Sequence, residues 1–159
     1  MTIRILCVGK LKEPYFEAAE AEFQKRLRRF CTVEIAEVPD ERAPETLSAA
    51  QRRQVMDREG ERLLARIGAD EHVVALAIGG TRRTSEAFAA HLGQLRDGGA
   101  RCVTFVIGGS LGLSGAVLQR ANETLSLSDM TLPHRIARLV LLEQVYRAHK
   151  ILFGEPYHK

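Results

Sequence analysis

The sequence predicts a single α/β domain whose sheet is mostly parallel and is covered by helices on both faces. Strand-like runs alternate with helical patterns along the whole chain, which is the order of an α/β fold. Two of these runs, residues 72–80 and 101–109, are apolar at almost every position, as strands are when both faces of their sheet are buried. The 159 residues contain no repeat and no linker, so we expect one domain over residues 1–159.

The first part of the chain predicts a strand, a helix and a second strand. Residues 3–9 form a short run of β-forming side chains that ends in glycine. A helix is expected over residues 14–29, because it opens with proline and its apolar side chains recur with helical spacing. Residues 32–38 alternate between polar and apolar side chains, which predicts the second strand.

The middle of the chain predicts two helices around a buried strand. Ser48 opens a capping-box pattern, and a polar helix is expected from there to a stop at Gly68. The first of the two apolar runs then forms the third strand. The following helix is expected to be capped by Thr84 or Ser85 and to end near Asp97.

The last part of the chain predicts a strand, a short helix, a strand that leads into a loop, and a long helix. The second apolar run is the fourth strand, and Ser114 is the expected cap of a helix that reaches about Asn122. Residues 124–132 are strand-like and then loop-like. The final helix is expected from residue 133 or 134 to His149, followed by a tail over residues 151–159.

The final helix is apolar around most of its circumference. A helix of this kind is buried on several sides, whereas an outer helix of a chain this short should keep one face in water. We therefore expect a homodimer through this helix. The alternative is a central helix within one chain.

Composition excludes several classes of protein. No apolar run approaches the ~20 residues that span a bilayer, and the first ten residues look like a strand rather than a signal peptide, so we expect no membrane association. Three distant cysteines without a CxxC pair predict a reduced, cytoplasmic protein. The five histidines show no metal-ligand spacing, so no metal site is expected.

The formal net charge of +3 is concentrated near the C-terminus. Residues 134–159 contain five Lys or Arg and two Glu, whereas residues 1–133 contain 18 basic and 18 acidic side chains. A local excess of positive charge indicates a partner that carries phosphate. An ordinary solvated helix face would have the same composition.

Two glycine pairs mark the expected ligand site. In a parallel sheet ligands bind beyond the carboxyl ends of the strands, and both buried strands end in Gly-Gly. The second pair continues as GGSLGLS over residues 108–114, which differs from the GxGxxG of dehydrogenases and from the P-loop. A hydrolase triad of Ser128, Asp129 and His134 is disfavoured, because no GxSxG elbow accompanies it.

The tail carries side chains suited to chemistry on a nucleic acid. Residues 154–159 read GEPYHK, after an apolar lead-in that favours a tail held against the domain. Tyr157 has a ring that can stack on a base. His158 has an imidazole that exchanges protons near neutral pH.

Four motifs together resemble the RlmH family, the pseudouridine N3 methyltransferases of 23S ribosomal RNA. The motifs, in chain order, are IGGSLGLS (107–114), LSLSDMTLPH (125–134), LLEQVYRAHKI (141–151) and EPYHK (155–159). The likeness covers the whole chain, and the order, spacing and terminal position of the motifs are specific.

This resemblance implies a fold and a cofactor. The family has the SPOUT methyltransferase fold, in which the C-terminal part of a parallel sheet is threaded into a deep trefoil knot, and it is dimeric. The resemblance implies that S-adenosyl-L-methionine binds in the knot, without a metal. By motif position the cofactor-binding residues would be Leu76, Gly108, Leu127, Ser128, Asp129, Met130, Thr131 and Leu132.

The resemblance also implies a substrate, a pseudouridine in the helix 69 loop of 23S rRNA within the assembled ribosome. For the chemical roles we expect His158, or a water that it orients, to assist removal of the N3 proton. Arg147 would neutralise a phosphate or the developing anion, and Tyr157 would position the base. The alternatives are a SPOUT methyltransferase with another RNA target, such as a tRNA, and a non-catalytic ribosome-binding protein of the same fold.

Overall fold

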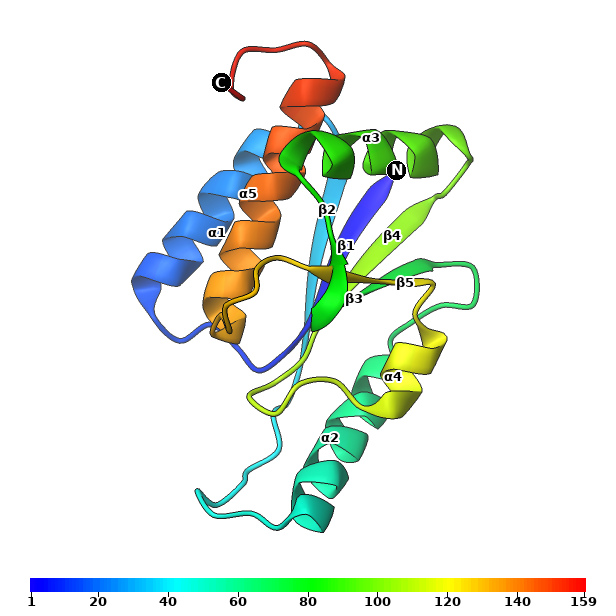
Figure 1. Cartoon of the computed structure of the whole chain (residues 1–159). Coiled ribbons are helices and arrows are strands. Elements are labelled where there is room, and N and C mark those ends of the chain that lie inside the picture. Colours follow the sequence, from blue (N-terminus) through cyan, green and yellow to red (C-terminus); the bar gives the residue numbers. More distant parts are fainter.

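A parallel sheet of five strands forms the centre of the structure, a computed structural model that describes residues 1–159 (Figure 1). The strands are β1 (Thr2–Val8), β2 (Thr32–Val38), β3 (His72–Arg82), β4 (Cys102–Ile107) and β5 (Glu123–Ser126). Their order across the sheet is β2-β1-β4-β3-β5, and every pairing is parallel. The α/β prediction is therefore confirmed.

Five helices alternate with the strands: α1 (Pro14–Leu27), α2 (Ala49–Leu64), α3 (Ser85–Asp97), α4 (Gly115–Arg120) and α5 (His134–Leu152). Ser48, Thr84 and Ser114 cap α2, α3 and α4, because each side chain accepts a hydrogen bond from a backbone N–H in the first turn. Two helix ends differ clearly from expectation, since α2 ends at Leu64, four residues before the expected stop at Gly68, and α5 continues three residues beyond His149. No helix combines the length and hydropathy that a membrane span requires.

The alternating side chains of the strands divide the interior into two cores. On β1, Ile3, Ile5 and Cys7 point into a core that is closed by α1, α3 and α5. Leu6 and Val8 point into a smaller core closed by α2 and α4. Both faces of the sheet are thus covered, which explains why its central strands are apolar at almost every position.

The long helix α5 lies between α1 and α3 on one face of the sheet (Figure 1). Its fully covered side chains include Leu141, Leu142, Val145 and Ala148, which belong to the larger core. Much of the apolar surface that the sequence argument assigned to a second copy is therefore buried within the chain. Ile136, in the first turn, is the apolar side chain of α5 that stays exposed.

A buried arginine connects α5 to two other elements. The side chain of Arg138 is 4% exposed and forms ion pairs with Glu20 of α1 and with Glu37 of β2, the latter at 2.7 Å. The Cys7 thiol lies beside this group, and burial raises its pKa to about 12, so Cys7 stays protonated and unreactive. The three cysteines form no disulfide.

Candidate functional site

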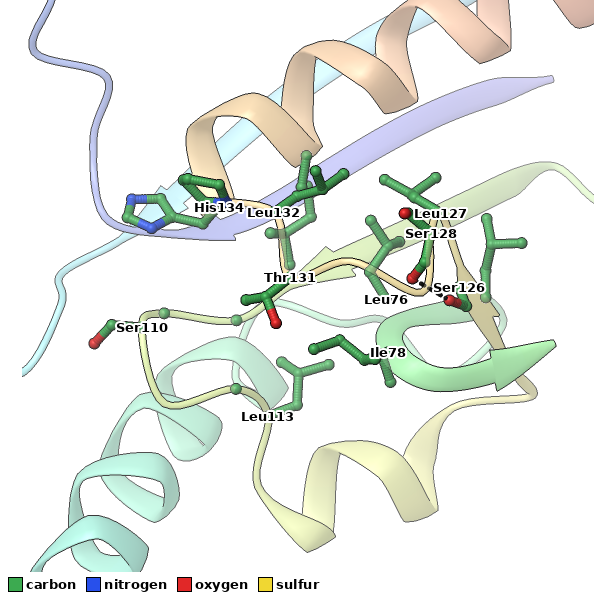
Figure 2. Close-up of a pocket in the computed structure, with 18 of the residues that line it drawn as sticks. Leu76, Ile78, Ser110, Leu113, Ser126, Leu127, Ser128, Thr131, Leu132 and His134 are labelled. Carbon is green, nitrogen blue, oxygen red and sulfur yellow. Dashed lines mark hydrogen bonds between the residues drawn. The ribbon is translucent and has the colours of Figure 1, made fainter. Parts of the chain in front are cut away.

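Three segments meet at the carboxyl-end side of the sheet and enclose a cavity of about 700 Å³ (Figure 2). They are residues 76–78 of β3, residues 107–113, which begin with the last residue of β4, and residues 125–134, which lead from β5 into α5. This is the position at which ligands bind to parallel α/β sheets. Both glycine pairs noted in the sequence lie in or beside these segments.

The first wall comes from an irregular part of β3. Leu125 of β5 pairs both with Leu76 and with Thr81, so residues 77–80 bend out between two limbs of the same strand. A Cβ added at Gly80 would lie 2.8 Å from the backbone of Leu125. The bend of β3 and the backbone of β5 therefore lie so close together here that only glycine fits at position 80. The bend carries Ile78 into the cavity wall, where Figure 2 shows it facing the loop after β5.

The second wall is the glycine loop after β4. The Gly112 N–H donates a hydrogen bond to the Gly109 carbonyl at 3.1 Å, and Gly112 has a φ of +93°, in the region that favours glycine. A Cβ at Gly108 would lie 2.7 Å from the carbonyl carbon and oxygen of Gly112. The loop can close only because Gly108 has no side chain, and it lines the cavity with backbone.

The third wall is the loop between β5 and α5. The Ser126 hydroxyl donates to the Ser128 carbonyl at 3.0 Å, and the Met130 N–H donates to the Ser128 hydroxyl at 3.0 Å. These bonds hold the loop so that Thr131 and Leu132 line the cavity (Figure 2).

The lining is mostly apolar and carries no carboxylate, lysine or arginine. Its one titratable side chain is His134, at the start of α5, and burial, followed by the positive charge of Arg135, lowers the pKa of this imidazole. His134 is therefore neutral at pH 7. Such a cavity suits a small ligand with a large apolar part, recognised by a few polar groups and by backbone.

The structure places most of the expected cofactor residues together. Those that line the cavity are Leu76, Gly108, Leu127, Ser128, Met130, Thr131 and Leu132. Asp129 does not line the cavity, and its side chain is 69% exposed and pairs with Arg82 at 2.7 Å, so its part in cofactor binding stays a prediction. If the Asp129 carboxylate faced the apolar cavity, it would lose its hydration and gain no partner in return. In the outward position it stays hydrated and keeps its ion pair with Arg82.

Several lining residues were missed by the sequence reasoning. They include Ile78, Leu113, Ser126, Pro133, His134 and Ala137. Ile78 precedes one glycine pair and Leu113 ends the glycine loop. The sequence prediction could therefore have included these two residues, which adjoin the glycine motifs. Ala137 had no such signal, because only the packing of α5 brings it to the cavity.

The tail residues expected to do chemistry also lie together. The Tyr157 hydroxyl donates to Glu143 at 3.0 Å, and the Arg147 guanidinium carbon lies 4.7 Å from the centre of the Tyr157 ring. Arg147 Nη1 is 3.3 Å from His158 Nδ1. Burial, and then the hydrogen bond to Glu143, raises the pKa of Tyr157, so its hydroxyl stays protonated at neutral pH. These contacts pin the tail to α5, as the apolar lead-in led us to expect.

One further contact holds the end of the tail on α3. His158 Nε2 lies 2.9 Å from Glu86, in the first turn of that helix. The backbone N–H of Glu86 and the His158 imidazole lower the pKa of the Glu86 carboxyl to about 2, so it is an anion at neutral pH. The imidazole is thereby oriented by a fixed negative charge.

The tail and the cavity are separate within one chain. His158, Arg147 and Tyr157 do not line the cavity. Arg147 is ten residues beyond Ala137, the last cavity residue on α5, which corresponds to about 15 Å along the helix axis. Figure 1 shows the C-terminus at the opposite end of α5 from the loops that build the cavity. Within one chain, the expected catalytic residues therefore do not meet the cavity.

Comparisons with known proteins agree on the type of protein. A family model described as "Predicted SPOUT methyltransferase" matches residues 1–158. Proteins named ribosomal RNA large subunit methyltransferase H are similar over the full length of both chains, with 58% identity in Listeria monocytogenes serotype 4b and 55% in Exiguobacterium sibiricum. A crystal structure of a tRNA (m1G37) methyltransferase from Aquifex aeolicus has the same fold, with a TM-score of 0.56 and 15% identity over 100% of this chain and 75% of the other.

Proposed function

This chain belongs to the SPOUT methyltransferases and, within them, to the RlmH family of large-subunit ribosomal RNA methyltransferases, and from this membership we propose a specific reaction. It methylates N3 of a pseudouridine in the helix 69 loop of 23S rRNA, with S-adenosyl-L-methionine as the donor and the assembled ribosome as the substrate. The proposal depends chiefly on one observation, the cavity built by residues 107–113 and 125–134, which are two of the motifs shared with the family. The place of action is the cytoplasm, where ribosomes are.

The cavity fits the proposed cofactor. Its volume of about 700 Å³ lies in the range of small-molecule sites, and its walls are mainly apolar side chains and glycine backbone. Leu76, Leu127 and Leu132 would contact the apolar surface of the nucleoside, and the backbone of the glycine loop would supply hydrogen bonds. When bound, S-adenosyl-L-methionine supplies a methyl group on a positively charged sulfur. No basic side chain in the cavity wall opposes that charge.

We also propose that the C-terminal part of the chain is threaded as a trefoil knot. Support comes from the double pairing of Leu125, which places β5 against two limbs of β3. The close approach of Gly80 to the Leu125 backbone agrees with one segment passing through the other. Knots are rare in proteins, and local sequence patterns carry no signal for them.

A homodimer would join the two parts of the site. Three exposed apolar side chains line the cavity, namely Ile78, Leu118 and Met130, and Ile136 in the first turn of α5 is also exposed. Exposed apolar side chains at the rim of a cavity mark an interaction surface. We place the dimer contact on α5, with the two copies of this helix antiparallel across a two-fold axis, so that the tail of one protomer reaches the cavity of its partner.

The tail then has the following roles in the proposed reaction. His158, directly or through a water, accepts the proton that N3 of the base must lose before it can take the methyl group. Arg147 neutralises the negative charge that develops on the base or a neighbouring phosphate. Tyr157 stacks on or otherwise positions the base so that N3 is directed at the cavity. The pinned arrangement of these side chains keeps them close together before substrate arrives.

The proposed reaction is tested by transfer of a tritiated methyl group from S-adenosyl-L-methionine to ribosomes that lack this modification, followed by mass spectrometry of the labelled nucleoside. We expect label on N3 of pseudouridine in 23S rRNA of the assembled ribosome and little label in free 23S rRNA. A weakly charged protein of this size depends on the shape of the ribosome more than on long-range attraction. Label in tRNA would show that the substrate is a different RNA. Cofactor binding without any methyl transfer would support a non-catalytic binding protein instead.

A further inference from the structure

Two histidines and a glutamate converge at the amino ends of β3 and β5. His72 is the first residue of β3, Glu123 is the first residue of β5, and His91 lies on α3. Both imidazole Nε2 atoms approach the same carboxylate oxygen, Glu123 Oε1, at 2.9 Å for His72 and 2.6 Å for His91. The three potential ligand atoms all lie within 4.8 Å of one another. The cavity described above lies at the other ends of the same strands, so this group is a separate feature.

The donor set is one that zinc favours. Two imidazole nitrogens and one carboxylate oxygen, with a water in the fourth position, is an established tetrahedral arrangement for Zn²⁺. The side chains of His72, His91 and Glu123 are 24%, 22% and 18% exposed, so they are held by the fold but are reachable from solvent. We propose that these three residues form a site for a divalent transition metal of the zinc type.

The surroundings leave one carboxylate oxygen of Glu123, Oε1, in contact with the two imidazoles. Arg83 donates to the other oxygen, Glu123 Oε2, at 3.1 Å, and this bond fixes the carboxylate with Oε1 toward the two imidazoles. A small void of about 10 Å³ borders His91, Arg83 and Glu123, which is about the space of one water molecule. Neutral imidazole binds a metal through an unprotonated nitrogen, so a proton on either Nε2 must move to Nδ1. The ligand atoms must also move apart, because those of a tetrahedral zinc site lie about 3.3 Å from one another.

A metal here would connect three elements. It would tie the first residue of β3 to the first residue of β5 and both to α3, which packs on α5. The site joins positions 19 and 32 residues apart along the chain, so no local spacing motif reveals it. Its effect is expected on stability rather than on methyl transfer, because a ligand that binds only the folded state raises its stability.

The test uses the full chain, purified without metal, and Zn²⁺ as the probe in titration calorimetry. We expect one Zn²⁺ per chain and a higher thermal midpoint in its presence. Co²⁺ in place of Zn²⁺ should give the intense visible absorption of a tetrahedral site. His91→Gln and Glu123→Gln should each weaken Zn²⁺ binding by at least about 100-fold, since loss of even an indirect partner of a metal ligand costs 10–100-fold.

Two further variants distinguish a preformed metal site from nonspecific binding of Zn²⁺ to histidine. His158→Gln is the matched control, because His158 also faces a carboxylate at 2.9 Å but has no second imidazole beside it; we expect unchanged Zn²⁺ affinity. Arg83→Gln should weaken binding by about 10–100-fold, because it removes the partner that holds Glu123 Oε1 toward the two imidazoles. The proposal is wrong if the wild-type chain takes up no Zn²⁺, or if its affinity is unaffected by His91→Gln and Glu123→Gln in variants that stay folded by circular dichroism.

Discussion

Gly108→Ala is expected to remove cofactor binding and to slow methyl transfer by about 100-fold or more, because displacing a reactive group by about 1 Å can cost that much. The added Cβ would sit 2.7 Å from the backbone carbonyl of Gly112. Backbone cannot rotate away as a flexible side chain can, so the glycine loop must shift and the cavity changes shape. Titration calorimetry with S-adenosyl-L-methionine and single-turnover transfer measure the two effects.

Gly79→Ala is the matched control for this variant. Gly79 lies in the bend of β3 close to the same cavity, but a Cβ at this position meets no atom within 4 Å. We expect its cofactor affinity to stay within about twofold of the wild type, as is usual for a substitution that touches nothing. Equal losses in the two variants, or wild-type affinity in Gly108→Ala, would contradict the role given to the loop.

Arg138→Ala is expected to lower the free energy of unfolding by about 3 kcal/mol, the lower end of the range for breaking a buried ion pair. The substitution leaves the carboxylates of Glu20 and Glu37 without their partner in the larger core region. The lower end of this energy range applies because the Glu37 side chain is 25% exposed, so water can hydrate its carboxylate once Arg138 is gone. Urea unfolding with an unchanged slope against denaturant is the measurement.

Arg82→Ala serves as the control for the buried pair. Arg82 also forms an ion pair, with Asp129 at 2.7 Å, but both side chains are exposed. An exposed pair is worth about 0–1 kcal/mol, so this variant should unfold close to the wild type. If the two variants lose the same stability, Arg138 does not hold α5, α1 and β2 together in the way described.

The strands and helices were predictable because each follows from local patterns. Alternation gives β2, continuous apolar runs give β3 and β4, and capping residues give the starts of α2, α3 and α4. The covering of both sheet faces follows from the same runs. The end of α5 was less predictable, because Ile151 and Leu152 suit either a helix or an apolar lead-in to the tail.

The features that escaped prediction are set by contacts between distant parts of the chain. The bend of β3 depends on Leu125 pairing twice, and nothing in residues 77–80 except glycine points to it. Asp129 sits within a motif that lines the cavity, yet its side chain turns outward to Arg82, 47 residues away. The cluster of His72, His91 and Glu123 likewise exists only once α3 has packed beside the sheet.

The cavity loops and the tail each follow from a sequence motif, whereas the distance between them within one chain is set by the fold. The sequence gives the tail residues and the cavity loops as separate motifs, and the fold of one chain keeps them apart by about 15 Å along α5. Their separation has a simple explanation if each active site takes its cavity from one protomer and its tail from the partner. That arrangement makes the dimer contact on α5 part of the function.

Mixed dimers test this arrangement most directly. Gly108→Ala chains, defective in the cavity, are mixed and exchanged with His158→Ala chains, defective in the tail, and methyl transfer to unmodified ribosomes is measured. Each variant alone should be slow. Random exchange gives about half mixed dimers, each with one intact site, so transfer should recover to about one quarter of the wild-type rate. No recovery, in mixtures shown by mass spectrometry to contain mixed dimers, would contradict an active site shared between protomers.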